Sequence, residues 1–332
     1  MRLRIAVLLL VPLVLASIAA TPTWAGQPAA TLRLERSLDA MGTTYTIAVY
    51  GTDRWRLDDA MEDAFEEVHR LDQLLSNYRP ESEWSRVNRD AAKRAVPVSE
   101  ELFRLLEQCV EYSRQSDGAF DITVGPLMKI WGFYKADGRI PHRSEIRTAM
   151  SSVGWRHIVL DSKARTVRFD APVEIDPGGI GKGYAVDSMA AVLRKKGITS
   201  GVISAGRSSI YAIGTPPDEP RGWRVTIPDP RDTRKVAAEY YLKDSSMSTS
   251  GNTEKFFVAG GVTYSHIMDP RTGSPSRGML AVSVIAPRTL DSEAWTKPYF
   301  ILGRQWAAQH KPKSFQVFLC EDRLEIACVS LP

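Results

Sequence analysis

The 332-residue sequence contains few of the residues that build metal clusters or disulfide frameworks. It has three cysteines, Cys109, Cys320 and Cys328, and five histidines that are scattered along the chain. It contains no CxxC pair, no HExxH motif and no group of neighbouring histidines. These absences argue against a structural zinc site and against a zinc protease.

The two C-terminal cysteines, Cys320 and Cys328, flank an expected hairpin turn between strands at about 315–319 and 324–329. A short turn would place each cysteine opposite a residue other than its partner, so that the two sulfur atoms would not meet. We therefore expect buried free thiols, with a disulfide in an oxidising compartment as the alternative.

Neither sign of charge dominates, since 43 Lys and Arg stand against 39 Asp and Glu, a net charge of +4. This balance argues against a general nucleic-acid-binding or membrane-coating role. After residue 20 no apolar run approaches the roughly 20 residues that a membrane span requires. With 43% hydrophobic and 25% charged residues, the composition is that of a globular protein.

The N-terminus has the pattern of a secretory signal peptide over residues 1–25. Arg2 and Arg4 precede an apolar run at 5–20, and small residues around Ala25 offer a cleavage position. We expect an exported protein, periplasmic or otherwise extracytoplasmic and soluble after cleavage. An uncleaved N-terminal anchor is the alternative.

The rest of the chain, 32–332, predicts one α+β domain with mixed or antiparallel sheets and a few packed helices. Apolar spacing predicts helices at 57–75, 100–116 with Ser99 as N-cap, 184–196 and 292–302. Strands are expected within 32–50 and at 157–160, 166–169, 173–175, 201–204, 210–213, 223–227, 240–242 and 279–285. The stretch 119–133, rich in glycine, proline and aromatic residues, is expected to be a loop.

A glycine-rich segment, Gly-Gly-Ile-Gly-Lys-Gly at 178–183, lies between an expected apolar strand and a helix. Free amides at a helix start attract phosphate, and Lys182 adds a positive charge. The segment is neither a Walker A loop nor a GxGxxG motif, so an ordinary tight turn is the alternative.

Two further polar segments could take part in chemistry. His266 and Asp269 are three residues apart before an expected turn, where the histidine could act as a general base or contact a phosphate oxygen. The alternative is a histidine that caps the turn. Arg207, in a polar break between two strands, is weak support for anion binding.

A series of segments in a fixed order resembles the ApbE family, the FAD:protein FMN transferases, from about residue 34 to residue 303. These are MGTTY (41–45), LSNYRPESE (75–83), Asn88, GAFDITVGP (118–126), WG (131–132), DPGGIGKGYAVD (176–187), TSG (249–251) and SHIMDPRTG (265–273).

The resemblance implies a T-fold-like ApbE domain in an exported enzyme. Such enzymes bind FAD as substrate, cleave its pyrophosphate, transfer FMN to a Ser or Thr hydroxyl of an exported or membrane acceptor protein, and release AMP with the help of Mg²⁺. Some members chiefly hydrolyse FAD. Nucleic acid is not an expected partner, and membrane association is expected only through an uncleaved N-terminus or the acceptor.

Residue by residue, the resemblance implies catalytic roles for His266, Asp269 and Lys182. A flat ring can stack on a heterocycle, carboxylates can accept hydrogen bonds, and the glycine turn can hold the pyrophosphate. The implied flavin-nucleotide contacts are Met41, Tyr78, Ala119, Phe120, Asp121, Asp176, Gly178, Gly179, Tyr184 and Ile267.

The metal region departs from the family pattern, in which an Asp and a Thr four residues later join a carbonyl of the glycine-rich loop around Mg²⁺. Here Glu293 and Lys297 occupy these two positions, and a protonated lysine cannot be a ligand. A site from Gly181, Glu293 and Thr296 is one prediction, and replacement of the ion by Lys297 is another. A surface lysine that pairs with Glu293 is the third possibility.

A second departure lies at 206–209, where Gly-Arg-Ser-Ser replaces the Gly-Gly-Asp often found in the family; Pro177 also stands where an aliphatic residue is usual. An FMN transferase is the leading hypothesis for this divergent sequence. The alternatives are an FAD-binding protein without turnover, an FAD pyrophosphatase, and a function outside flavin chemistry.

Overall fold

The computed structural model describes residues 30–135, 137–252, 255–323 and 327–331. Residues 31–332 form one compact unit. The predicted signal peptide, 1–25, lies outside the described residues. Among the described residues no helix is both long enough and apolar enough to cross a bilayer.

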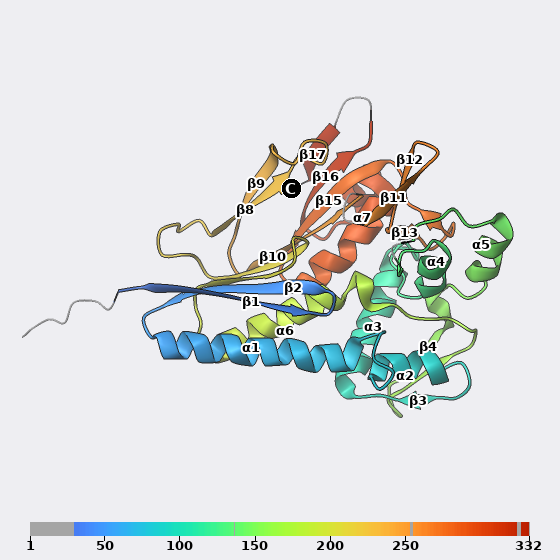
Figure 1. Ribbon diagram of the computed structural model, residues 1–332, viewed down its shortest axis with the longest axis horizontal. Coiled ribbons are helices and arrows are strands. Elements are labelled where there is room, and N and C mark those ends of the chain that lie inside the picture. The colour runs from blue at the N-terminus through green and yellow to red at the C-terminus, as the bar shows by residue number, and fades with distance from the viewer. Residues whose placement is uncertain (1–29, 136, 253–254, 324–326, 332) are drawn as a thin grey trace, which may run out of the picture. The chain divides into compact units, whose positions relative to one another are not determined.

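Within the described residues, an antiparallel sheet runs in the order β1-β2-β6-β7-β10-β15-β16-β17 (Figure 1). Every neighbouring pair in this sheet is antiparallel, which confirms the α+β prediction. Its strands are β1 (Leu32–Ala40), β2 (Thr43–Gly51), β6 (Gly201–Ala205), β7 (Ser209–Ile213), β10 (Ser245–Gly251), β15 (Met279–Ala286), β16 (Gln316–Glu321) and β17 (Ala327–Leu331).

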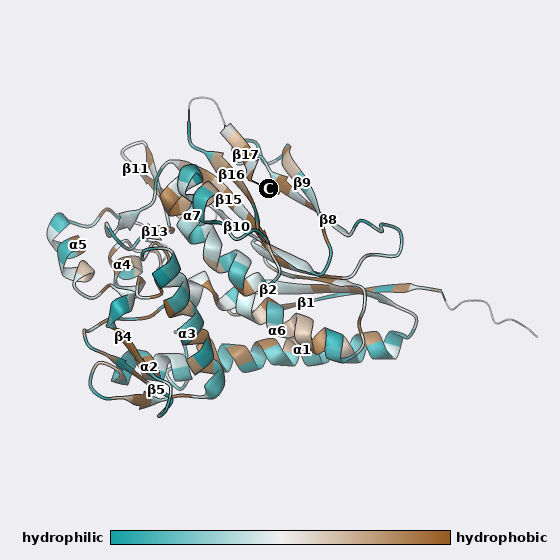
Figure 2. Cartoon of the chain, turned by 180° about the vertical axis from the view of Figure 1, so that it is seen from behind, coloured by the Kyte–Doolittle hydropathy of each residue, from teal (hydrophilic) through white to brown (hydrophobic). Residues whose placement is uncertain are grey.

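Three long helices pack on one face of this sheet: α1 (Arg54–Leu75), α6 (Gly181–Lys195) and α7 (Thr289–His310). Helix α1 carries buried residues at helical spacing, among them Leu57, Met61 and Val68, and exposed charged residues between them. Figure 2 shows this mixture of hydrophobic and hydrophilic residues along α1. Amphipathic spacing therefore predicted α1 correctly, because burial of one stripe is what stabilises such a helix.

The opposite face of the sheet packs against the hairpin of β8 (Trp223–Pro228) and β9 (Val236–Leu242). Near this hairpin, Cys320 and Cys328 form a disulfide, so the expectation of free thiols at these two positions is wrong. In the observed register Cys320 faces Cys328 and Glu321 faces Ala327. The connection is therefore longer than the short turn that we assumed, and it brings the cysteines opposite each other.

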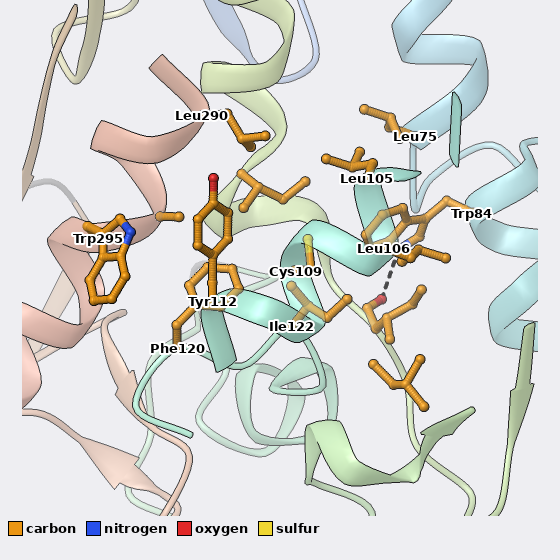
Figure 3. Packing of buried hydrophobic residues seen from close by; sticks show 14 of the residues in the cluster. Leu75, Trp84, Leu105, Leu106, Cys109, Tyr112, Phe120, Ile122, Leu290 and Trp295 are labelled. Atoms are coloured by element: carbon orange, nitrogen blue, oxygen red, sulfur yellow. Dashed lines mark hydrogen bonds between the residues drawn. The ribbon is translucent and has the colours of Figure 1, made fainter. Parts of the chain in front are cut away.

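A second group of elements packs beside the sheet around α3 (Glu100–Gln115), which begins after the predicted N-cap Ser99. It contains α2 (Glu83–Asp90) and a small sheet of β3 (Val96–Pro97), β5 (Thr166–Phe169) and β4 (Ile158–Asp161). Figure 3 shows its core, in which the Trp84 indole donates a hydrogen bond to the Ile175 carbonyl at 3.0 Å. This bond anchors the backbone directly before the glycine-rich segment.

Two predictions in this region need correction. The stretch 119–133 is not wholly loop, because α4 (Gly125–Ile130) begins there with a proline in its first turn. Residues 173–175 form no strand, and their backbone is held instead by the side chains of Trp84 and Asn88. The neighbouring elements are α5 (Arg143–Met150), the hairpin of β11 (Phe256–Ala259) and β12 (Val262–Ser265), and the short pair β13 (Met268–Asp269) and β14 (Ser274–Pro275).

Strand β10, in the middle of the sheet, has no apolar alternation and was not predicted. Its small side chains allow α7 to approach closely: the Ser248 hydroxyl bonds Ser292, and the Ser250 hydroxyl bonds Thr296. Helix α7 begins three residues before the predicted 292–302, and a backbone break at Gly303, whose φ is 80°, separates its first segment, which ends where predicted, from a second one. Hydroxyl pairs thus replace apolar packing between β10 and α7.

Candidate functional site

The glycine-rich segment forms a tight connection that opens helix α6. Asp176 caps a single 3₁₀ turn, Pro177–Gly179, by accepting the Gly178 amide at 2.7 Å. Helix α6 then begins at Gly181, three residues before the predicted start at Tyr184. The first amides of α6 therefore lie within the glycine-rich segment itself, as a phosphate-binding helix start requires.

Several predicted nucleotide contacts surround this segment. The Phe120 ring lies 3.4 Å from where a Cβ on Gly179 would be, and the Met41 methyl lies 3.7 Å from the same point on Gly181. Tyr78 follows the end of α1 and is 80% exposed, so its ring is accessible for stacking. Ala119 and Ile267 are buried. The structure thus brings Met41, Phe120 and the glycines together.

Asp176 is held by residues from three segments. Its carboxylate accepts hydrogen bonds from the Asn77 amide, the Tyr134 hydroxyl and the Gly178 amide. Burial raises the pKa of Asp176, while the hydrogen bonds from Tyr134 and Gly178 oppose this rise. Asp176 therefore ties the residue beside Tyr78 to the glycine-rich segment.

Two buried carboxylates clamp the starts of α6 and α7 to each other. Glu293 on α7 accepts the Gly183 amide of α6, and Asp187 on α6 accepts the amides of Thr289 and Leu290 at 2.7 and 2.8 Å. A Cβ on Gly183 would lie 2.6 Å from the Thr289 carbonyl oxygen, so the close approach requires glycine. We call Gly183, Asp187, Thr289, Leu290 and Glu293 the helix junction.

Two lysines lie on either side of the start of α6. The Lys182 ammonium donates to the Ser208 hydroxyl, in the polar turn between β6 and β7. The Lys297 ammonium lies 3.2 Å from the Gly179 carbonyl oxygen and 2.9 Å from that of Glu293. Arg207 is exposed on the same turn as Ser208. Positive charge is thus concentrated around the glycine-rich segment.

The geometry of His266 defines its tautomer. Nδ1 lies 3.1 Å from the Lys255 carbonyl oxygen, which can only accept, so Nδ1 carries the proton and Nε2 has the lone pair. Burial, the largest cause, and the charges of Lys297, Lys255 and Lys182 together lower the pKa of His266 to about 4. At neutral pH His266 is therefore a neutral imidazole that can accept a proton at Nε2.

Other predicted site residues are engaged within the protein. Asp121 accepts hydrogen bonds from Thr123 and from the Trp155 amide, and burial raises its pKa. Asp269 forms a two-point ion pair with Arg271. The Tyr184 hydroxyl donates to Glu101 on α3 at 2.9 Å. The carboxylate of Asp269 is therefore committed to Arg271, and that of Asp121 to Thr123 and the Trp155 amide.

The predicted magnesium donors do not fit a metal ion. Glu293 accepts the Gly183 amide, the Thr296 hydroxyl donates to the Glu293 carbonyl at 2.7 Å, and Gly181 opens α6. No group of three or more acidic, His or Cys side chains suited to a metal occurs among the described residues.

The Lys297 ammonium already lies close to the carbonyl oxygen of Gly179. A divalent ion on the Gly179 carbonyl would lie within about 5 Å of the Lys297 ammonium. We therefore assign no step of the chemistry to a metal ion.

Four residues of the site had no role in the sequence analysis: Asn77, Tyr134, Ser208 and Lys255. Asn77 adjoins Tyr78 in a segment that resembles the family, which is a signal that could have identified it. Tyr134 and Lys255 come from stretches without periodicity, and only the folded chain brings them to Asp176 and His266.

Comparison with known proteins agrees with this geometry. The sequence pattern of the ApbE family matches residues 41–318. The FAD:protein FMN transferase of Salmonella typhimurium is 31% identical over 280 residues, covering 81% of this chain and 78% of the relative. That of Escherichia coli is 31% identical over 297 residues, covering 85% and 83%.

Solved structures show the same fold. The ApbE protein of Thermotoga maritima superposes with a TM-score of 0.82 at 29% identity, covering 89% of this chain and 96% of the other. The flavinyl transferase ApbE of Pseudomonas stutzeri, in its apo form, gives 0.80 at 26% identity, with 90% and 95% coverage. With a family match over most of its length and relatives above 30% identity, this chain belongs to the ApbE family.

Proposed function

We propose that this protein is an FAD:protein FMN transferase that moves FMN from FAD to a Ser or Thr hydroxyl of an acceptor protein. The observation that carries the proposal is the arrangement of a neutral His266 near the glycine-rich start of α6, with Lys182 and Lys297 beside it. The helix start and the two ammonium groups suit a pyrophosphate, and the imidazole suits a hydroxyl that must lose a proton.

The reaction balances without any change in oxidation state. The acceptor oxygen attacks the FMN-side phosphorus of FAD and forms a new P–O bond. The bond from that phosphorus to the bridging oxygen breaks, and AMP leaves with the bridging oxygen. The hydroxyl proton goes to Nε2 of His266. Such transfers depend on positioning and on charge stabilisation, which the amides and lysines provide.

We place the flavin end of FAD against Phe120 and Tyr78, because both rings adjoin the glycine-rich segment or its Asp176 support. Asp269 acts through its ion pair, which holds the turn that follows His266. Mg²⁺, which the resemblance implies, has no assigned step, because the described donor atoms do not suit it.

We propose that the protein works outside the cytoplasm, with an acceptor that is exported or embedded in a membrane. The N-terminal pattern supports export. The disulfide between Cys320 and Cys328 supports it independently, because such bonds persist in oxidising compartments. Association with a membrane would come through the acceptor or an uncleaved N-terminus.

The test mixes the protein without residues 1–25, FAD and an acceptor protein that the Escherichia coli relative modifies under the same conditions. Free AMP and protein-bound FMN are then quantified, with Mg²⁺ and with EDTA. Equal amounts of AMP and bound FMN support the transferase. AMP with free FMN would instead show an FAD pyrophosphatase. FAD that binds without AMP release would show a flavin-binding protein without turnover.

A further inference from the structure

A short loop after helix α4 touches both halves of the site. It is described at 131–135 and 137–139, and we call these residues the connecting loop. The Tyr134 hydroxyl donates to one oxygen of the Asp176 carboxylate, whose other oxygen accepts the Gly178 amide at 2.7 Å. The connecting loop therefore holds the side chain that shapes the glycine-rich turn.

The same loop packs against the β11–β12 hairpin, which leads to His266. The centroid of its Phe133 ring lies 5.8 Å from that of Phe257 on β11. The centroid of its Trp131 ring lies 5.6 Å from that of Tyr264 on β12. Phe257 and Tyr264 stack on each other across the hairpin, with centroids 5.1 Å apart. Contacts among these four rings hold the hairpin against the connecting loop.

Two close contacts make this packing specific. A Cβ on Gly138 would lie 2.3 Å from the Phe257 ring, so the backbone of the connecting loop runs directly along that ring and requires glycine there. The Trp131 indole donates to the Gly273 carbonyl at 2.9 Å, in the turn between β13 and β14. The connecting loop is thus fixed to the hairpin and to the turn that follows it.

The hairpin in turn places the imidazole of His266. The His266 amide donates to the Lys255 carbonyl at 3.0 Å, and Nδ1 of the same ring lies 3.1 Å from that oxygen. Lys255 directly precedes β11 and His266 directly follows β12, so the two ends of the hairpin hold the ring together. A shift of the hairpin would therefore move Nε2 relative to the glycine-rich segment.

We propose that the connecting loop sets the distance between the His266 imidazole and the pyrophosphate, with Tyr134 as its positioning residue. This inference rests on the proposed function. Tyr134 holds the glycine-rich turn through Asp176, and the aromatic rings hold the His266 hairpin. Transfer to a hydroxyl requires the oxygen, its base and the phosphorus in one geometry, and a displacement of about 1 Å can lower a rate about 100-fold.

The first test is Tyr134→Phe, which removes the hydroxyl and keeps the ring. The maximal rate of AMP release should fall about 10- to 100-fold. FAD affinity, measured by flavin fluorescence, should change by less than about threefold, because Asp176 still accepts the Gly178 amide and the turn still forms. Tyr241→Phe on β9 is the matched control, since its hydroxyl also donates to a carboxylate, that of Glu239 at 2.9 Å, and it should keep the wild-type rate.

A second measurement does not depend on turnover. Hydrogen exchange followed by mass spectrometry compares peptides that cover 176–183 and 256–267. Tyr134→Phe should speed exchange in both peptides about 3- to 10-fold, as expected for the loss of one hydrogen bond. Phe257→Leu, which loosens the hairpin, should do the same, because coupling between two segments is reciprocal. Tyr241→Phe should change neither peptide.

Each outcome decides the inference. A folded Tyr134→Phe variant with the wild-type rate would overturn it, as would a rate and an affinity that fall by the same factor. Faster exchange confined to one of the two peptides would also overturn it, because the connecting loop would then not link them. If the wild type transfers no FMN to the acceptor, the proposed function fails, and the exchange comparison still decides whether the connecting loop links the two segments.

Discussion

The helix junction and the ligand-facing rim of the site lie side by side but use charged groups in opposite ways. In the junction, Asp187 and Glu293 are turned inward and accept backbone amides of the facing helix. At the rim, which we define as Tyr78, Lys182, His266 and Lys297, the charged side chains are basic.

The comparison shows that an acidic residue beside a glycine-rich helix start can serve as an acceptor for backbone amides. Buried amides at a helix start require acceptors, and leaving them without partners costs about 1–3 kcal/mol each. The carboxylates of the junction meet that need. Changes in the junction should therefore alter stability, and changes at the rim should alter FAD binding or the transfer rate.

The largest effect is expected at the rim. His266→Ala should lower the transfer rate about 100- to 10,000-fold, because a general base contributes about that factor. The melting temperature should change little. The initial rate of AMP release, with the exposed His69→Ala variant of α1 as the matched control, measures this effect. A variant that kept the full rate would remove His266 from the mechanism.

The pH dependence tests the same residue. Because burial lowers the pKa of His266 to about 4, its Nε2 stays available from neutral pH down to about 5, and the rate should fall only as the pH approaches 4.

The stability of the fold should also depend on pH through His266. In the unfolded chain this histidine has the usual pKa of about 6.5, so it is protonated there at a higher pH than in the folded protein. The stability contributed by neutral His266 is therefore lost progressively as the pH falls from about 6.5 to about 4. Chemical denaturation of wild type and His266→Ala across this window measures the loss, and identical curves for the two proteins would contradict it.

In the junction, Gly183→Ala should lower the free energy of unfolding by about 3 kcal/mol. The added Cβ would lie 2.6 Å from the Thr289 carbonyl oxygen and 2.8 Å from the Glu293 carboxylate, neither of which can move without separating the helices. Gly181→Ala in the same helix is the control, since its Cβ would make only ordinary contacts of 3.7 Å or more. Urea denaturation of both variants should show a large loss for the first and little change for the second.

Glu293 gives a direct test of the junction against a metal-ligand role. Glu293→Ala should cost about 2–3 kcal/mol, because it leaves the buried Gly183 amide without an acceptor. Glu293→Gln keeps an acceptor oxygen and should cost about 1 kcal/mol or less. Thermal and urea unfolding measure both. If Glu293→Gln were stable but transferred FMN only with excess Mg²⁺, the carboxylate would belong to a metal site.

The smallest effect is expected at Tyr78. This ring is 80% exposed, so Tyr78→Ala should leave the stability unchanged. It should weaken FAD binding about 5- to 10-fold, which corresponds to the loss of about 1 kcal/mol of ring stacking. Tyr78→Phe keeps the ring and should bind FAD normally. Equal affinities for all three proteins would show that the ring does not contact the flavin.

Periodic segments of the fold could be predicted from the sequence. The helices that became α1 and α3, with Ser99 as N-cap, and the β4–β5 hairpin were predicted correctly, because burial of a regular stripe and local capping are properties of neighbouring residues. Strand β10 was not predicted, since its serines gain their partners from α7. The register of the last hairpin, which makes the disulfide, also depends on a longer connection than the local pattern indicated.

The sequence by itself determined the family, the glycine-rich start of α6 and the residue types available to the site. Only the tertiary structure decided which partners these residues have. Glu293 meets Gly183 across 110 residues and Lys297 meets Gly179 across 118, so neither pairing is visible in local spacing. The reason is that every buried amide must find an acceptor, and the packing of α6 on α7 supplies a carboxylate for this purpose. Glu293, a predicted metal ligand, therefore accepts the Gly183 amide in the structure.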